Sequence, residues 1–399
     1  MAVADALLTI DEALALVLGH VEPLDAEEVE LASVAGRVVA EPARSAVDLP
    51  PFPSSAMDGF ALRSADAPGT LPVVARIAAG HPAPRPLEAG EAMAISTGGV
   101  VPDGADSVVP IEVVEEGDGS VAILGDVDTG DNVRPRGGDL RAGDVVVEAG
   151  VRLGPAHVGA LAASGVTSVR CTRVPRVVIV VTGSELRAPG ESLAPGQIYD
   201  ANGFILAAQL RSTGADVERL PPVADDEGAT RAAIERGLDA DVLVTTGGVS
   251  VGVYDLVRAT EAELGVEEIF WRVAMQPGKP VAFGVRGRTL VFGLPGNPVS
   301  SLVGFELFVR PALLALQRLA DPRPAFLPGR LGSPAKRLAA RDALLRARTR
   351  VEGEVVRVDP LTGQQSHMIA QAAGANALVL VPQGDGELPA GTAVSYLPL

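Results

Sequence analysis

The chain has 399 residues, which is enough for two to four domains with buried cores. Its formal net charge of -17, from 33 basic and 50 acidic residues, argues against a nucleic-acid duplex as partner, because duplex binding needs basic patches. A hydrophobic content of 47% with 21% charged residues is typical of a globular protein, and 45 glycines with 32 prolines indicate many turns.

Two residue types are unusually rare. Only Lys279 and Lys336 are lysines, beside 31 arginines, so a lysine that is kept here is a candidate for work that arginine cannot do. Asparagine is equally scarce and occurs only at Asn132, Asn202, Asn297 and Asn376.

The remaining composition excludes several kinds of site. Cys171 is the only cysteine, which excludes an internal disulfide and a cysteine-rich metal site, and we expect it to be a small buried residue. The four histidines lack metal-ligand spacing. Acidic residues interrupt the N-terminus, so no secretory signal is expected, and no apolar run approaches the length of a membrane span. We therefore expect a cytoplasmic protein without a membrane partner.

The first part of the chain predicts a helical domain with a β-rich insertion. Thr9 and Glu12 have the spacing of a capping box and begin an amphipathic helix, and 29–40 is predicted as a second short helix. Short β-branched runs separated by glycine and proline predict a β-rich module at 48–144. A helix at 155–164 resembles the opening region again, so 1–47 and 145–175 are predicted to form one domain.

The second part of the chain alternates strands and helices. Val177–Val181 is a continuous apolar run, as a strand buried on both faces requires, and similar runs alternate with helical patterns to about residue 322. This alternation predicts a doubly wound α/β domain at 176–322 with a mostly parallel sheet. Strands broken by glycine and proline return at 323–399, which predicts a small β-barrel or sandwich.

Three glycine-containing loops follow predicted strands of the α/β domain, at 182–185, 246–252 and 293–301. The carboxyl ends of parallel strands share one edge of a sheet, where ligands bind. Glycine allows close backbone approach there, and successive N–H groups with a helix beginning near Pro298 predict an anion cradle. No loop fits a P-loop or a dinucleotide fingerprint, so those nucleotide-binding classes are not favoured.

Carboxylates surround the same predicted edge. Asp200, Asp225 and Asp255 each have a simpler explanation as helix caps, whereas Glu185 has no evident capping role. Carboxylates beside an anion site require a cation between them, and Mg²⁺ held by one or two carboxylates and a phosphate is the usual arrangement. Lys279, in a Gln-Pro-Gly-Lys-Pro segment, is a candidate phosphate ligand, because its ammonium group binds phosphate as a point charge.

Three loops of the β-rich module carry polar residues whose function cannot be inferred from the residues alone. They are 54–61 with Asp58, 96–99 with Thr97, and 134–139 with Arg136 and Asp139. Asp58-Gly59 is equally explained as a simple turn.

Together these motifs resemble those of the MoeA family of molybdopterin molybdotransferases, whose eukaryotic relative is the E domain of gephyrin. The matching segments occur in order, at 55–61, 182–186, 246–252 with Asp255, 277–280 and 293–300. The resemblance implies a MogA-like central α/β domain and a four-domain homodimer with an active cleft shared between subunits. It implies adenylylated molybdopterin and molybdate as substrates, molybdate replacing the metal on the dithiolene, and Mg²⁺-dependent release of AMP. It also implies an upstream molybdopterin adenylyltransferase.

Site residues follow from the same resemblance. Asp58, Thr97 and Asp139 would form the wall contributed by the partner subunit, and Glu185, Asp225 and Asp255 would bind metal and activate water. Oxyanions would be held by Arg136, Arg272 and Lys279. The other expected substrate-binding residues are Thr182, Gly183, Ser184, Asp200, Gly247, Gly248, Ser250, Pro295, Gly296, Asn297, Pro298 and Ser300. Gln276 departs from the family pattern, since many relatives carry lysine there, and part of the cationic role would move to Lys279 or Arg272.

Two alternatives stay open. Molybdopterin adenylyltransferase uses a similar α/β domain alone, and the additional modules at both ends of this chain count against it. A non-catalytic scaffold, as the gephyrin E domain also serves, is the second alternative. The presence of every expected acidic ligand counts against that one.

Overall fold

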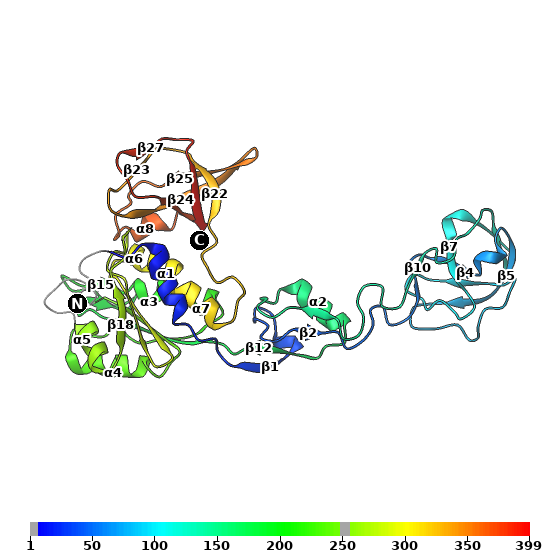
Figure 1. Cartoon of the computed structure of the whole chain (residues 1–399), viewed down its shortest axis with the longest axis horizontal. Coiled ribbons are helices and arrows are strands. Elements are labelled where there is room, and N and C mark those ends of the chain that lie inside the picture. Colours follow the sequence, from blue (N-terminus) through cyan, green and yellow to red (C-terminus); the bar gives the residue numbers. More distant parts are fainter. Residues whose placement is uncertain (1–6, 248–255) are drawn as a thin grey trace. The chain divides into compact units, whose positions relative to one another are not determined.

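A computed structural model describes residues 7–247 and 256–399. The chain divides into two compact units (Figure 1). Unit 1 contains Met1–Glu27, Gly36–Val38 and Thr172–Leu399, and unit 2 contains Glu28–Ala35 and Val39–Cys171.

The centre of unit 1 is a six-stranded sheet. Its order is β16 (Asp216–Arg219), β13 (Arg176–Val181), β17 (Val242–Thr246), β21 (Thr289–Leu294), β20 (Ala282–Arg286) and β18 (Glu267–Trp271). The first four strands are parallel, and β20 and β18 are antiparallel to their neighbours. The strand order reverses at β13, which lies between β16 and β17.

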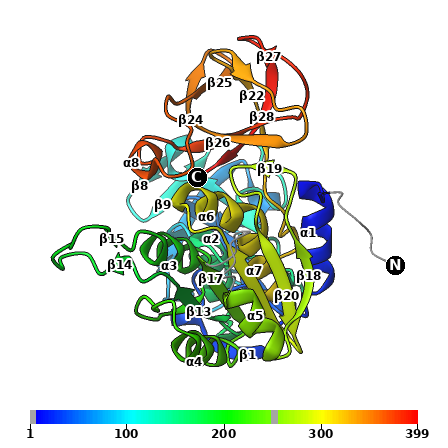
Figure 2. The ribbon, with the colours of Figure 1, turned by 90° about the vertical axis from the view of Figure 1, so that its left-hand side faces the viewer.

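Helices cover both faces of this sheet (Figure 2). Val177 and Ile179 of β13 pack in one core with α1 (Ile10–Gly19), α3 (Asn202–Ser212) and the helical stretch that follows β21. Val178 and Val180 point to the other core, beside α4 (Glu227–Gly237) and α5 (Leu256–Glu263). This alternation confirms the predicted doubly wound α/β domain.

The helical stretch after β21 is long and strongly apolar. It consists of α6 (Pro298–Gly304), a π-helical turn η4 (Phe305–Val309) and α7 (Arg310–Leu316). Over 19 residues it has the length and hydropathy of a membrane span, but 78% of its most apolar window is buried. Glu306 and Arg310 interrupt its apolar sequence, and the burial shows that this stretch is a core helix of unit 1.

The C-terminal strands of unit 1 form a closed five-stranded barrel. The strands are β22 (Leu327–Leu331), β24 (Asp342–Glu352), β25 (Val355–Pro360), β26 (Ala377–Val381) and β28 (Ala393–Pro398). They pair in the circular order β24-β25-β22-β28-β26-β24, which confirms the predicted barrel. The short strand β19 (Met275–Gln276) extends from the α/β domain and pairs with the start of β24.

The β-rich module is a six-stranded sheet in unit 2. Its order is β7 (Ser107–Pro110), β4 (Gly59–Leu62), β6 (Ala92–Ile95), β5 (Gly69–Ile77), β9 (Ser120–Ile123) and β8 (Val114–Gly117). Side chains of β4 alternate between two hydrophobic clusters, one with Phe60 and Leu62 and the other with Ala61. A short pair, β3 (Ser54–Ser55) with β10 (Val133–Arg134), joins two of the polar loops.

The rest of unit 2 corrects one predicted element. Residues 29–40 do not form a helix: β1 (Ala26–Glu30) pairs with β12 (Ser168–Thr172), and a 3-10 turn, η1 (Leu31–Ser33), follows. Gly36 has a φ of 80°, which interrupts any helix. The helix α2 (Pro155–Ala163) forms as predicted. Cys171 is buried in the same small core, as expected.

The first helix, α1, packs in the α/β domain, whereas the predicted boundaries group 1–47 with 145–175. Its capping box between Thr9 and Glu12 is present, but Leu14 and Val17 are buried in the core of the α/β domain. Because the apolar face of α1 is covered by that core, Met1–Glu27 belongs to unit 1. The four-domain division itself stays a prediction.

Candidate functional site

A cavity of about 800 Å³ lies at the carboxyl ends of β13 and β17, where the strand order reverses. This is the position at which open α/β sheets bind ligands. Eight of the residues expected from the sequence line it: Thr182, Gly183, Glu185, Asp200, Asp225, Gly247, Gly296 and Pro298. Gly248, Ser250 and Asp255 lie outside the described residues.

The backbone of the first two glycine loops is tied to the protein itself. The N–H of Gly183 donates to the Val223 carbonyl at 3.0 Å, and the N–H of Gly247 donates to the Leu294 carbonyl at 3.3 Å. These groups do not form the expected N–H cradle. Glycine at 247 instead allows the backbone of Thr182 to approach closely, because a Cβ there would lie 2.6 Å from the Thr182 carbonyl oxygen, and the backbone φ is +93°.

Glu185 and Asp225 present carboxylates to the cavity. Both are exposed, and the Glu185 carboxylate turns back over Gly183, where a Cβ would lie 2.6 Å from Glu185 Oε2. Asp225 is held by Ser184, whose N–H donates to Asp225 Oδ2 at 3.1 Å. Capping does not explain Asp225, because the neighbouring Asp226 caps α4 by accepting from the Ala229 N–H at 2.8 Å.

Asp200 has a structural role that the sequence suggested. Its Oδ1 accepts from the Gly203 N–H at 2.8 Å and so satisfies a donor in the first turn of α3, whose N-cap residue is Ala201. Its Oδ2 accepts from Arg219 at 3.2 Å. Although Asp200 lines the cavity, both of its oxygens have protein partners.

The loop after β21 is fixed by a buried hydroxyl network. Ser301 Oγ donates to the Pro295 carbonyl at 2.6 Å, and Thr246 Oγ1 lies 3.2 Å from Ser301 Oγ. The N–H of Val299 donates to the Ser366 carbonyl at 3.1 Å, which connects this loop to the C-terminal barrel. Ser300 is buried and Asn297 is exposed at the start of α6, and neither lines the cavity.

The expected cations Arg272 and Lys279 do not line the cavity in the described part of the chain. The Arg272 guanidinium lies 3.6 Å from the centre of the Trp271 ring, and the Arg258 guanidinium lies 4.1 Å from the same ring centre. Arg272 has a φ of 82°, a conformation rare for any residue with a side chain. Lys279 is half-buried, and its carbonyl accepts from the Val273 N–H at 2.9 Å.

In unit 2, the structure brings together Asp58 and Thr97. The Thr97 N–H donates to Asp58 Oδ1 at 2.9 Å, so the two polar loops expected to form one wall are joined. Arg136 is already paired, since its Nε donates to Asp48 at 2.6 Å. The Ala142 N–H and this arginine hold the pKa of Asp48 below its ordinary value. The neighbouring Asp139 is anchored by its N–H to the Leu49 carbonyl at 3.0 Å.

Sequence reasoning did not assign several residues that the structure places at the site. Ile198, Tyr199 and Asn202 line the cavity, and the scarcity of asparagine was the one signal that pointed to Asn202. Away from the cavity, Arg346 in the barrel is 1% exposed and donates to the carbonyls of Gly363, Gln365 and Met368. Because the chain contains 31 arginines, nothing in the sequence distinguished this one.

The fold and cavity define a multidomain enzyme whose doubly wound domain presents carboxylates to a ligand at the point where the strand order reverses. Three family models match in order: the MoeA N-terminal region (domain I and II) at 8–165, the probable molybdopterin binding domain at 178–315, and the MoeA C-terminal region (domain IV) at 328–399. The chain belongs to the MoeA family of molybdopterin molybdenumtransferases, transferases of molybdenum cofactor biosynthesis.

Known relatives match this chain over nearly its full length. Molybdopterin molybdenumtransferase 2 from Mycobacterium tuberculosis is 38% identical over 91% of this chain and 93% of its own length. The molybdopterin molybdenumtransferase of Haemophilus influenzae is 33% identical over 98% of both chains. A solved structure of the molybdopterin biosynthesis MoeA protein from Pyrococcus horikosii has a TM-score of 0.84 and 32% identity, and it covers 98% of this chain and 99% of that chain.

Proposed function

We propose that this protein inserts molybdenum from molybdate into the dithiolene of adenylylated molybdopterin and releases AMP in a Mg²⁺-dependent step. The observation that carries this proposal is the pair of exposed carboxylates, Glu185 and Asp225, in the cavity at the reversal of the strand order. Family membership supplies the substrate class.

The residues present fit magnesium. The described ranges contain no group of three or more potential metal-binding side chains, and magnesium needs only one or two carboxylates, with substrate phosphate and water completing its shell. The Glu185 side chain accepts no hydrogen bond within those ranges, so its oxygens are available. Glu185 and Asp225 would hold the ion, with Asp255 as the third expected ligand, and a bound ion would neutralise phosphate charge and polarise the phosphoanhydride.

The chain's own groups have separate tasks in this reaction. A water oxygen bonds to phosphorus as the P–O bond of the phosphoanhydride bridge breaks, so AMP leaves and the pterin keeps its own phosphate. Ser184 orients Asp225 through its N–H, and the absence of a side chain on Gly183 lets the Glu185 carboxylate lie against the backbone at the cavity. A carboxylate without a protein partner, such as Glu185, can also accept the proton of the attacking water.

A direct assay tests the proposal. Purified protein is mixed with adenylylated molybdopterin, Mg²⁺ and molybdate, and AMP release and active cofactor are measured. We expect both products, loss of both with EDTA, and no active cofactor without molybdate. An enzyme that instead makes adenylylated molybdopterin from ATP and molybdopterin would be the adenylyltransferase, and one that does neither would fit the scaffold alternative.

We further propose that the protein is a cytoplasmic homodimer in which Asp58 and Thr97 of one subunit complete the cavity of the other, and that a molybdopterin adenylyltransferase supplies its substrate. Mixing Asp58→Asn with Glu185→Gln subunits tests the shared site. A shared site gives heterodimers with one intact cavity and restores roughly a quarter of the wild-type activity. A site built within one subunit restores none, and a measured monomer mass would exclude the dimer.

A further inference from the structure

The C-terminal region is the basic part of an acidic chain. Residues 323–399 contain nine basic and six acidic residues, whereas the whole chain contains 33 basic and 50 acidic residues. The barrel strands β22, β25 and β24 lie side by side in this region. They carry four exposed or half-buried arginines: Arg330, Arg348, Arg350 and Arg357. A local excess of positive charge therefore lies on a chain that is otherwise strongly acidic.

The strand register places three of these arginines in one row. Arg330 of β22 is paired with Arg357 of β25, and Arg357 is paired with Arg350 of β24. Leu331 and Val358, the next residues along β22 and β25, are buried in the barrel core. Because side chains alternate along a strand and paired residues share a face, the row lies on the outer face of the barrel. Neighbouring strands lie about 5 Å apart, so the row spans about 10 Å.

Two carboxylates neutralise only part of this charge. Asp359 accepts from Arg350 Nη2 at 2.7 Å and from Arg357 Nε at 3.0 Å. Glu352 lies 3.9 Å from Arg350 and 3.6 Å from Arg357. Both carboxylates therefore serve the same two arginines.

Arg330 and Arg348 form no ion pair with any residue that the structure describes. Both are exposed, and Arg330 Nη1 donates to the Gly391 carbonyl at 2.9 Å. Like charges on paired strands repel each other, so the pairing of Arg330 with Arg357 does not stabilise the barrel. Arginine binds carboxylates through two parallel hydrogen bonds, which suits it to the recognition of carboxylate groups. The two unpaired cations are available to carboxylates of another molecule.

Apolar side chains adjoin the arginines. Val351 is 78% exposed and Val355 is 39% exposed, in the hairpin of β24 and β25 that projects from the barrel (Figure 1). Glu352 and Glu354 at the same turn would repel the phosphates of a nucleic acid. Interfaces between proteins, in contrast, are enriched in arginine around an apolar centre. The composition of this face therefore favours a protein partner.

We propose that the outer face of β22, β25 and β24 binds an acidic segment of another protein, whose carboxylates pair with Arg330 and Arg348 and whose apolar side chains cover Val351. The inference does not depend on the proposed reaction, because none of these residues is among those that line the cavity at the carboxyl ends of β13 and β17.

The test measures the fluorescence anisotropy of a short labelled peptide, in which Glu alternates with Leu, during titration with the full-length protein. We expect saturable binding that weakens at least fivefold between about 0.02 M and about 0.2 M NaCl, because salt screens exposed charges. Arg330→Gln combined with Arg348→Gln should weaken binding about tenfold, since one exposed ion pair contributes up to about fivefold. The matched control combines Arg323→Gln with Lys336→Gln, exposed cations outside this face, and should bind as wild type does.

Val351→Ser separates a protein partner from a bare polyanion. We expect it to weaken peptide binding about threefold, because it removes apolar surface that the leucines cover. Unchanged peptide binding by this variant, or tighter binding of a DNA duplex than of the peptide, would show a general polyanion site and overturn the choice of a protein partner. Absence of saturable peptide binding, or equal weakening by the control pair, would show that the face recognises no acidic segment.

Discussion

Ser184 and Asp225 hold each other through two reciprocal hydrogen bonds. The Ser184 N–H donates to Asp225 Oδ2 at 3.1 Å, and the Asp225 N–H donates to Ser184 Oγ at 3.0 Å. The two residues lie on loops that are 41 positions apart in the chain. Because this pair joins the loop after β13 to the loop before α4, it fixes a carboxylate at the cavity while the adjacent Asp226 caps the helix.

Asp225→Asn should reduce the rate of AMP release by about a hundredfold or more, because it removes a charge from the proposed metal site while keeping the shape of the side chain. The concentration of Mg²⁺ for half-maximal activity should rise as well. The matched control is Asp226→Asn. Asparagine caps helices as well as aspartate does, so this neighbour should keep wild-type activity. Equal effects of the two substitutions would contradict the metal-site assignment.

Lys279→Arg should reduce kcat/KM for molybdate at least tenfold in the same assay, since the planar guanidinium cannot replace a compact ammonium group. Lys336, the only other lysine, lies in the short strand β23 (Ala335–Lys336), which pairs with β27 (Glu387–Leu388) outside the five barrel strands, and it provides the control. Lys336→Arg should have no effect. Full activity of Lys279→Arg would remove the argument from lysine scarcity.

The positions of the carboxylates could be predicted from the sequence because parallel strands bring their carboxyl ends to one edge. The run Val177–Val181 identified a strand buried on both faces, and the loop after it had to lie at the site. The roles of the loop N–H groups could not be predicted. Whether Gly183 donates to a ligand or to Val223 depends on a bond between segments that are distant in sequence.

The wrong helix at 29–40 has a similar cause. The segment contains several valines, and because β-branched residues suit strands as well as helices, the pairing of β1 with β12 decided the outcome. The position of α1 depended likewise on tertiary packing. Its amphipathic pattern and its capping box could be predicted from the sequence, whereas the core against which Leu14 packs could not.

Arg346→Met should destabilise the barrel by about 2–4 kcal/mol, because three carbonyls of the 363–368 loop lose a buried charged donor. Burial already lowers the pKa of Arg346, and among the residues that the structure describes no acidic side chain pairs with it. The Ser366 carbonyl accepts from Val299, so hydrogen exchange should increase in both loops. The control is Arg348→Met on the same strand, whose exposed side chain should be dispensable. Unchanged exchange in Arg346→Met would refute the role of this arginine.

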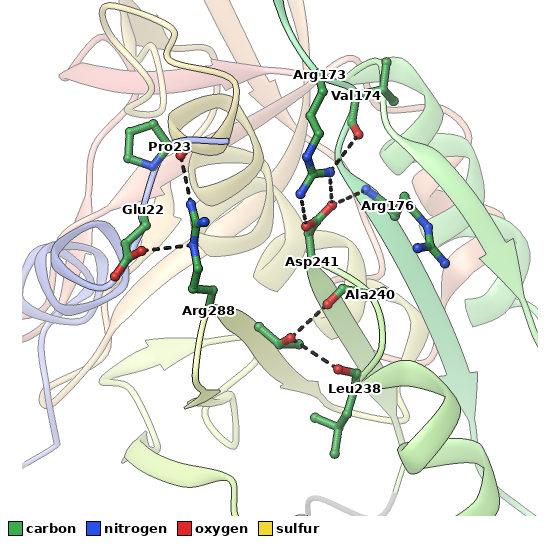
Figure 3. A network of polar contacts seen from close by, with 10 residues as sticks. Glu22, Pro23, Arg173, Val174, Arg176, Leu238, Ala240, Asp241 and Arg288 are labelled. Carbon is green, nitrogen blue, oxygen red and sulfur yellow. Dashed lines mark hydrogen bonds and ion pairs between the residues drawn. The ribbon is translucent and has the colours of Figure 1, made fainter. Parts of the chain in front are cut away.

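Asp241 and Arg173 should make a pH-dependent contribution to the stability of unit 1. Arg173 Nη2 and Nη1 donate to the two oxygens of the Asp241 carboxylate, at 2.6 and 2.7 Å (Figure 3). The Arg176 N–H donates to the same carboxylate at 2.8 Å. Partial burial alone raises the pKa of Asp241, but these hydrogen bonds outweigh it and leave the pKa below its ordinary value. The pair therefore stabilises the fold above about pH 4, and that stability is lost as the pH falls through the lowered pKa.

Asp241→Asn should accordingly reduce the free energy of unfolding by about 2 kcal/mol at pH 7, measured with urea, because it removes the charge that these hydrogen bonds strengthen. The difference from wild type should shrink as the pH falls below about 4, because the unfolded wild-type chain then binds a proton at Asp241 before the folded chain does. Asp239→Asn, an exposed neighbour, is the control and should change stability at neither pH. A difference that stays constant from pH 7 to the acid range would show that Asp241 acts through shape and not through its charge.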